Sequence, residues 1–247
     1  MPNSIIELDS GVTARQRERK FLLGAEAAQA FWQVARHHLR DQPQDATRPY
    51  TFLRTSYFDT PGLSFFHSGR GPVARRLRVR EYAVTAHVGG VPELSASCFL
   101  ELKQSSRGER VKLRVPLEVG DLGVQLAKLA EGPLTPVLTT WYQRRALADD
   151  SDGLRVTLDH DIRFCGPIAV GSPCLSDQPP HVFANGPSHV LEVKLWGAPP
   201  PWLARELGAL TESIRFSKFN AGMKAAEECG LLGGSGWNQG LQATARP

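Results

Sequence analysis

The sequence predicts a single, mainly β domain (α+β overall) in which antiparallel strands close into a barrel, with helices flanking it. Short runs of alternating apolar and polar residues recur along the chain, and turn-forming residues separate most of them. A chain of 247 residues, 41% of them hydrophobic, can bury one core, and barrels of this length commonly form one domain. Strands are predicted at residues 16–23, 52–58, 74–82, 98–103, 110–115, 137–146, 154–160 and 189–196.

Four helices are predicted between and after these strands. The first covers residues 25–39, where apolar residues recur at helical spacing, and the second begins at Asp121 as its N-cap. The third follows the prolines at 199–201, and the last runs from Ser217 as N-cap to Cys229. We expect their apolar faces to cover the outside of the barrel. On the third helix that face consists of Leu203, Leu207, Leu210 and Ile214.

The ends of the chain differ from the part between them. Residues 1–14 form a polar leader without the features of a signal peptide, and the Gly-rich residues 231–247 are expected to form a flexible tail. This leaves 15–230 as the folded domain. No apolar run approaches the roughly 18 residues that span a bilayer, so we expect a cytoplasmic protein without direct membrane insertion. The four cysteines form no CxxC pair, and a zinc site is not predicted.

The strongest functional signal is a set of strands whose polar face is mostly cationic. Residues two apart on a strand share a face, so Arg76, Arg78 and Arg80 project together while Leu77 and Val79 point the other way. The same alternation pairs Glu18 with Lys20, Glu101 with Lys103, Lys112 with Arg110 and Arg114, and Glu192 with Lys194.

A solvated outer face is the alternative explanation for these charges, because an antiparallel sheet often has one wet side. Such faces usually mix both signs with Thr, Ser and Gln, whereas here cations prevail over five strands. If the face points inward, two arginines about 7 Å apart repel by about 2 kcal/mol at an effective dielectric near 20. An enclosed basic wall therefore needs a polyanion. Phosphates suit it because a guanidinium group binds them through two hydrogen bonds.

The acidic residues of these strands indicate a metal. Glu18, Glu101 and Glu192 each stand two residues from a lysine. Carboxylates of this kind bind Mg²⁺ or Mn²⁺, which usually coordinate substrate phosphates at the same time. The alternative for each glutamate is that it only neutralises its lysine.

Nine short motifs follow one another between Arg15 and Cys229, and their order and spacing are more specific than any one of them. They are ERKF (18–21), SYFDT (56–60), RLRVREY (76–82), FLELK (99–103), ERVKLR (109–114), YQRRA (142–146), RVTLD (155–159), LEVK (191–194) and FSKFNAG (216–222). In combination they resemble the VTC domain of polyphosphate polymerases, within the triphosphate tunnel metalloenzyme (CYTH-like) superfamily.

The resemblance implies a tunnel of about eight strands in which ATP donates its terminal phosphate to a growing polyphosphate chain. It implies a phosphotransferase dependent on Mn²⁺ or Mg²⁺, with ATP and inorganic polyphosphate or triphosphate as partners and any membrane-protein partner unknown. Glu192 resembles the metal-binding glutamate, and Tyr142 resembles the tyrosine that accompanies Arg144, although core packing remains equally open for Tyr142. The phosphate clamp would consist of Lys20, Arg78, Arg80, Lys103, Lys112, Arg144, Lys194 and Lys218. Arg76, Arg114, Arg155 and Ser217 are further substrate-binding candidates.

The sequence departs from the superfamily pattern at Gln16, where the first position of a Glu-x-Glu-x-Lys signature often has a carboxylate. This removes one possible metal ligand and disfavours hydrolysis. Two alternatives to a polymerase stay open. One is a triphosphatase of inorganic or organic triphosphates, and the other is a module that binds polyphosphate or inositol phosphates without turnover. RNA is disfavoured because Leu and Val, rather than stacking aromatic residues, alternate with the cations.

Overall fold

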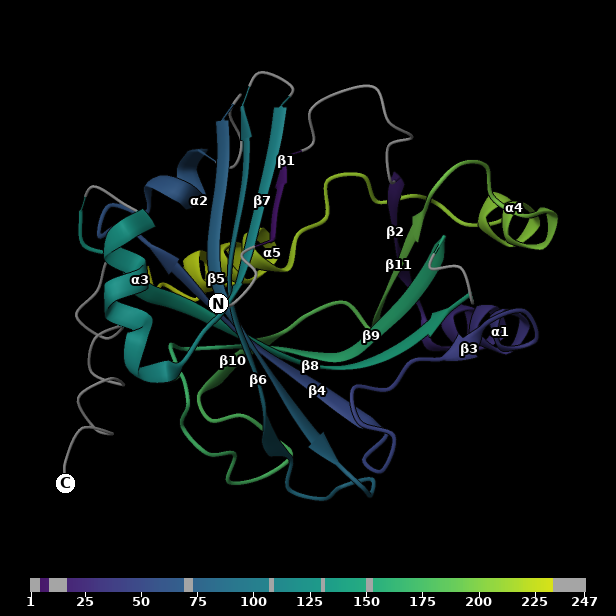
Figure 1. Cartoon of the computed structure of the whole chain (residues 1–247), viewed down its shortest axis with the longest axis horizontal. Helices are drawn as coiled ribbons and strands as arrows, with labels where there is room; N and C mark the ends of the chain where they lie inside the picture. The colour runs from purple at the N-terminus through teal and green to yellow at the C-terminus, as the bar shows by residue number, and fades with distance from the viewer. Residues whose placement is uncertain are drawn as a thin grey trace.

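The structure is a computed structural model that describes residues 5–8, 17–68, 73–106, 109–129, 132–149 and 153–232. Within these ranges, eleven strands form one antiparallel sheet (Figure 1). The strand order is β1-β7-β6-β5-β4-β8-β9-β11-β2, while β3 pairs with β8 and β10 pairs with β9. The strands are β1 (Ile5–Leu8), β2 (Arg17–Leu23), β3 (Arg40–Asp41), β4 (Tyr50–Asp59), β5 (Val73–Thr85), β6 (Glu93–Ser106), β7 (Glu109–Pro116), β8 (Thr135–Ala148), β9 (Leu154–Cys165), β10 (Val182–Asn185) and β11 (His189–Leu195).

Five α-helices accompany the sheet in the described part of the chain. They are α1 (Ala25–Arg36), α2 (Ser64–Ser68), α3 (Leu122–Leu129), α4 (Pro201–Gly208) and α5 (Lys218–Glu228), and a 3-10 turn over Val119–Asp121 leads into α3. The four predicted helices are therefore confirmed, with α1 and α4 ending earlier than expected. The short helix α2 was missed, because five residues are too few to show a helical period.

The prediction of a closed barrel is wrong. Among the described strands, β1 and β2 lie at opposite ends of the sheet order and do not pair with each other, so the sheet is open. In Figure 1, β5 and β7 rise on one side and β2 and β11 on the other. Alternation along a strand fixes which side chains share a face. It carries no information on whether two edge strands meet, and this is why the prediction failed.

All eight predicted strands are present, with ends shifted by a few residues. The short strands β3 and β10 were missed, and so was β1, which lies inside the predicted polar leader. The rest of that leader and residues 233–247 of the predicted tail lie outside the described residues.

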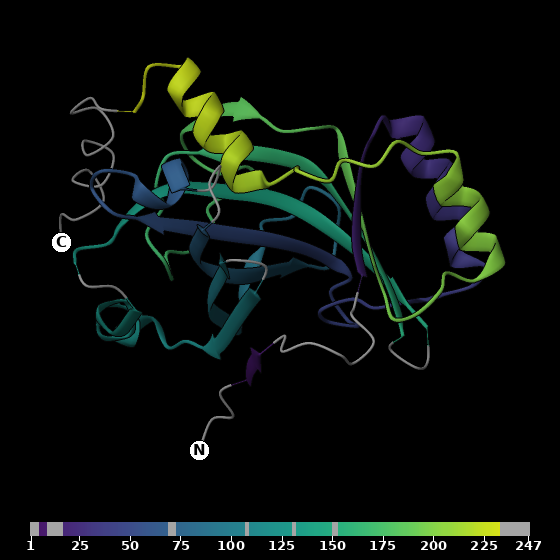
Figure 2. The same cartoon turned by 90° about the horizontal axis from the view of Figure 1, so that it is seen from above.

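Two helices cover one face of the sheet at its β2 end. The helices α1 and α4 lie side by side in both views (Figures 1 and 2). Phe31 and Leu203, one from each helix, pack with Val193 and other apolar residues of β2, β9 and β11. Ile214, predicted on the same apolar helix face, is 84% exposed because α4 ends at Gly208.

The helix α5 packs on the opposite, charged face of the sheet, defined here as the face that carries Arg78 and Glu192. Figure 2 shows α5 and α3 on opposite sides of the sheet. Phe219 and Met223 of α5 join a core cluster with Tyr142. The predicted N-cap is confirmed, since the Ser217 hydroxyl accepts a hydrogen bond from the Asn220 amide at 3.5 Å.

Two motif residues in the chain have structural roles. Gly222 lies against Leu138 and Phe164, and a Cβ atom there would come within 2.7 Å of Leu138, so only glycine allows this close approach of α5. The Asp59 carboxylate accepts hydrogen bonds from the amides of Thr60, Phe65 and Phe66 at 2.7–2.9 Å. It therefore fixes the turn that leads into α2.

Two further observations concern the cysteines and the helices. Cys98, Cys165, Cys174 and Cys229 are free thiols. Of the helices in the described ranges, none combines the length and the apolar character needed to cross a bilayer.

Candidate anion-binding site

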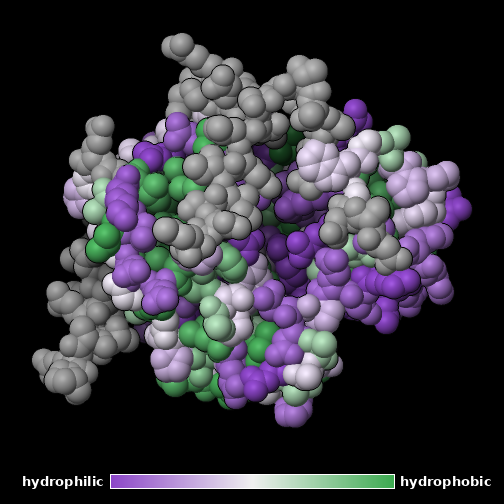
Figure 3. All heavy atoms as spheres, in the orientation of Figure 1, coloured by the Kyte–Doolittle hydropathy of each residue, from purple (hydrophilic) through white to green (hydrophobic). Residues whose placement is uncertain are grey.

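A pocket lies on the charged face of the sheet, between β4, β5 and β6 on one side and β2 and β11 on the other. Figure 3 shows hydrophilic side chains gathered in a hollow near the middle of the molecule. Of the described residues that line the pocket, eight are lysine or arginine and only Glu192 is acidic. The lining consists of Lys20, Tyr57, Arg76, Arg78, Arg80, Lys103, Tyr142, Arg144, Val190, Glu192, Lys194, Phe216, Ser217 and Lys218.

On the β5–β6 side, a buried carboxylate holds three arginines. Glu101, which is 2% exposed, accepts a hydrogen bond from Arg78 Nε at 2.7 Å, and the guanidinium groups of Arg114 and Arg80 lie 3.4 and 3.8 Å from it. Burial alone would raise the pKa of Glu101, but Arg78, Arg80 and Arg114 hold that pKa well below its usual range. Burial likewise opposes the charge of Arg78, yet Glu101 raises the pKa of Arg78. Glu101 and Arg78 are therefore both charged.

On the β8–β9 side, Asp159 is a second buried carboxylate that holds cations of the pocket. Its fully buried carboxylate accepts two hydrogen bonds from Arg144, at 2.6 and 2.8 Å, and one from Lys218 at 2.6 Å. Although burial opposes ionisation, Arg144 and Lys218 lower the pKa of Asp159. Because Lys218 is the first residue of α5, Asp159 fastens the start of this helix to the sheet beside the pocket.

On the β2–β11 side, lysines and glutamates alternate in neighbouring strands. Lys20 Nζ lies 2.7 Å from Glu18 and 4.0 Å from Glu192, while Lys194 Nζ lies 3.1 Å from Glu192. Burial would raise the pKa of Glu192, but Lys194 and Lys20 lower it well below its usual range. The pKa of Glu18 is also lowered, by Lys103 and Lys20 against burial and the nearby charge of Glu192. The two glutamates are thus close enough to repel each other.

Lys103 is a cation of the pocket without a paired carboxylate among the described residues. In the sheet register it lies between Arg76 of β5 and Lys112 of β7. Within the described residues, no carboxylate lies within 4.0 Å of its ammonium group. Burial, followed by the like charge of Arg78, lowers the pKa of Lys103 to about 7, although Glu18 and Glu192 act in the opposite direction. An incoming anion would stabilise its charged form.

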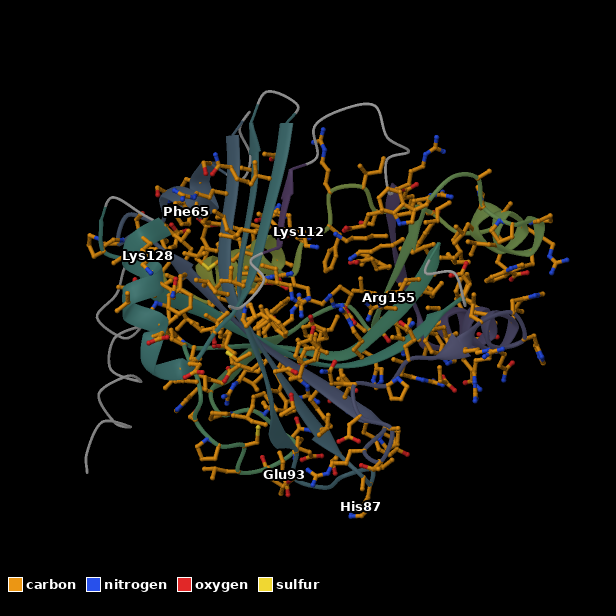
Figure 4. The ribbon with its side chains drawn as sticks, viewed as in Figure 1. Phe65, His87, Glu93, Lys112, Lys128 and Arg155 are labelled. Carbon is orange, nitrogen blue, oxygen red and sulfur yellow. The ribbon has the colours of Figure 1, made fainter. Side chains whose placement is uncertain are left out.

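The structure brings together eleven of the sixteen predicted site residues as pocket lining. Lys112, Arg114, Arg155, Glu18 and Glu101 do not line the pocket in the described residues. Arg114 packs over the Phe99 ring and donates to the Tyr82 hydroxyl at 3.3 Å. Arg155 is exposed on β9, and Figure 4 shows it and Lys112 on either side of the hollow.

Four residues of the site were missed in the sequence. Tyr57, Val190 and Phe216 line the pocket, and Asp159 lies beneath Arg144 and Lys218. Asp159 shares a strand face with Arg155 in the RVTLD motif, so strand parity could have identified it. Tyr57 lies opposite Arg78 in the β4–β5 ladder, a relation that appears only once the strands are paired.

The donor set for a metal is small. No group of three or more His, Cys, Asp or Glu side chains comes together in the described part of the chain. Glu101 is enclosed by arginines, which leaves Glu192 in the pocket lining and its neighbour Glu18 just outside it. Magnesium and manganese are commonly bound by one or two carboxylates together with substrate phosphates. The pair fits such an ion only when a phosphate completes the coordination.

The fold and the pocket define a class: an antiparallel α+β protein with a cation-lined pocket suited to a polyanion. The VTC domain model matches residues 123–227, from α3 to α5, and this match confirms the resemblance predicted from the motifs. The matched segment contains Arg144, Asp159, Glu192, Lys194 and Lys218. The motifs before residue 123 lie outside it.

Two solved structures are similar in backbone. The PH1819 protein from Pyrococcus horikoshii OT3 is 14% identical, with a TM-score of 0.49 over 86% of this chain and 99% of that one. A candidate adenylate cyclase from Bacillus halodurans is also 14% identical, with a TM-score of 0.49 over 83% and 96% of the two chains. At this level neither likeness bears on function. No curated protein sequence matches the chain significantly.

Proposed function

We propose that this protein binds a chain of phosphates in the cation-lined pocket and transfers the γ-phosphate of ATP to polyphosphate, with Mg²⁺ or Mn²⁺ as cofactor. The observation that carries the proposal is the composition of the lining, in which eight of the described residues are cationic and one is acidic. So many partly buried cations repel one another, and a polyanion removes that repulsion.

The two buried carboxylates explain how the cations are held ready for such a ligand. Glu101 and Asp159 each use one side of their arginine partners, Arg78 and Arg144, and leave other N–H groups free to face the pocket. Donors that are fixed before the substrate arrives lose little freedom when it binds. Phosphoryl transfer depends mainly on alignment and charge neutralisation, so this arrangement needs no nucleophilic side chain.

The β2–β11 side of the pocket supplies the candidate metal ligands. Glu192 and Glu18 would hold the ion, and Lys20, which now lies between them, would then be released towards a phosphate. When bound, the divalent ion supplies positive charge that neutralises phosphate oxygens. Lys194 keeps the remaining contact with Glu192 and helps to orient its carboxylate.

The test is to incubate the purified protein with ATP and each divalent metal and to resolve the products by size. Long polyphosphate chains are expected. Free phosphate without polyphosphate chains would indicate a triphosphatase activity instead of a polymerase activity. Water would then take the place of the acceptor phosphate. Tight triphosphate binding without any loss of ATP would leave a binding module only.

A pair of variants connects the activity to the pocket. The double change of Arg78 and Arg80 to alanine is expected to remove chain synthesis, because both guanidinium groups line the pocket. Arg36→Ala is the matched control, since Arg36 lies on α1 with a side chain that is 56% exposed. Equal synthesis by the double variant and the control would contradict the proposal.

A further inference from the structure

A phenol group that was not among the predicted site residues lies on the floor of the pocket. Tyr57, in the SYFDT motif, lines the pocket although its residue is only 4% exposed. Its ring is stacked on Phe219 of α5 with 5.0 Å between the centroids, and Phe66 of α2 meets Phe219 edge-on. The Tyr57 ring is thus held by Phe219 of α5, which Phe66 of α2 supports in turn, and its orientation does not depend on a ligand.

The surroundings of the Tyr57 oxygen are cationic. Burial would raise the pKa of Tyr57, but Arg78 and Arg80 of β5 and Lys218 of α5 lower it below the usual value. Arg78 is the direct neighbour of Tyr57 in the β4–β5 ladder, and its charge is the largest of the three that lower this pKa. All three cations line the same pocket. They interact favourably with the lone pairs of the oxygen and leave its proton to point elsewhere.

The proton of this phenol needs an acceptor that the described residues do not supply. The two buried carboxylates nearby, Glu101 and Asp159, are occupied by arginine and lysine donors. In the described ranges, Tyr57 donates no hydrogen bond to a protein acceptor. An anion in the pocket would provide one, since phosphate oxygens accept hydrogen bonds and carry the charge that the three cations attract.

We propose that Tyr57 is a further catalytic residue, whose phenol hydroxyl donates a hydrogen bond to a phosphoryl oxygen held by Arg78, Arg80 and Lys218. The inference rests on the proposed function and adds a neutral donor beside the three cations. The stacking of the ring on α5 fits this role, because a donor whose ring is fixed keeps its direction while substrates exchange.

The experiment compares Tyr57→Phe with Tyr50→Phe. Tyr57→Phe removes only the hydroxyl and keeps the ring that stacks on Phe219, whereas Tyr50 is 38% exposed at the start of β4 and serves as the control. Affinity for inorganic triphosphate is measured by calorimetry, kcat/KM by turnover of ATP, and folding by thermal unfolding. Hydrogen bonds to charged groups predict a loss of about 10- to 100-fold for Tyr57→Phe in both affinity and kcat/KM. Tyr50→Phe is expected to behave like the unmodified protein.

The outcomes separate this inference from the proposed function. If the unmodified protein binds triphosphate and Tyr57→Phe binds and turns over equally well, the role of Tyr57 is wrong while the pocket function stands. If the unmodified protein binds no triphosphate, both are wrong. Should Tyr57→Phe fail to fold, ultraviolet difference absorbance of Tyr142→Phe on addition of triphosphate replaces it, because Tyr57 is then the one tyrosine left among the described lining residues. A tyrosine signal that shifts supports the contact, and an unchanged signal contradicts it.

Discussion

The two sides of the pocket hold their cations in different ways. On the β5–β6 side, arginines share the carboxylate of Glu101, whose side chain is 2% exposed. On the β2–β11 side, Lys20 and Lys194 pair with Glu18 and Glu192, and all four side chains keep between 16% and 31% exposure. The first side has a buried anchor with fixed donors, and the second has partly solvated pairs that can exchange partners.

This difference indicates a division of work within the site. Planar guanidinium groups fixed by a carboxylate suit a phosphate in one orientation, whereas ammonium groups on flexible stems can follow a ligand that moves. A carboxylate that is only loosely paired can also release its lysine and accept a metal. We therefore expect substitutions on the β5–β6 side to affect folding and orientation, and those on the β2–β11 side to affect metal response.

The largest effect is expected for Glu101→Gln. Removing one partner of a buried ion pair leaves uncompensated charge, and Glu101→Gln should lower the free energy of unfolding by about 3–5 kcal/mol. Chemical unfolding measures the change. Glu93→Gln is the matched control, because Glu93 pairs with Arg48 at the surface and its side chain is 71% exposed. A loss of stability no greater than that of the control would contradict the anchoring role of Glu101.

A smaller effect is expected when arginine and lysine are exchanged. Arg78→Lys keeps the charge but loses the planar guanidinium that binds Glu101 and, in the proposed function, would bind a phosphate, so kcat/KM should fall by about 10- to 100-fold. Lys194→Arg, on the flexible side, should change it far less. The two variants are compared by ATP turnover at saturating metal. Equal losses would mean that the two sides do not differ as inferred.

Glu192→Gln tests whether the β2–β11 side of the pocket binds the metal. Without metal, the loss of one negative charge from the pocket should tighten triphosphate binding by about fivefold, equivalent to about 1 kcal/mol for a partly solvated pair. With Mg²⁺ or Mn²⁺ present, activity should fall because a candidate ligand is missing. Glu206→Gln, on α4, is the control. Titration calorimetry with and without metal measures both effects, and weaker metal-free binding would contradict the assignment.

The smallest effect is a pH dependence from Lys103. Its pKa of about 7 means that the ammonium form, which attracts phosphate, is lost as the pH rises through that value. Triphosphate affinity should therefore fall about threefold between pH about 6.5 and about 7.5 if only the charged form binds. Lys103→Arg keeps its charge and should flatten this part of the profile. A profile that is unchanged in Lys103→Arg would assign the titration to another group.

Strand parity in the sequence identified half of the described pocket lining, and the family resemblance added Tyr142, Arg144, Ser217 and Lys218. The spacing of Arg76, Arg78 and Arg80 placed them on one face, and Lys20 and Glu192 followed from the same rule. Parity does not show with which residue of opposite charge each side chain forms an ion pair. Glu101 was therefore predicted as a metal ligand, although arginines of β5 and β7 enclose it across the sheet.

Whether the sheet closes, and where α5 packs, depend on contacts between residues far apart in the sequence. Neither could therefore be predicted from local patterns. Lys218 reaches Asp159 across 59 positions in the sequence. The same limit applies to Ile214, which shares an apolar spacing with Leu203 but lies beyond the end of α4. Periodicity describes a helix face and does not state where the helix stops.

An open sheet leaves edges, and the edge at β2 is partly occupied. The amide of Ser213 donates a hydrogen bond to the Lys20 carbonyl at 2.7 Å, and Glu212 pairs with Arg19 at 2.8 Å. The segment between α4 and α5 therefore shields this edge from strand addition by a second molecule, a common route to aggregation. Changes that detach this segment from β2 are therefore expected to cause aggregation before they affect activity.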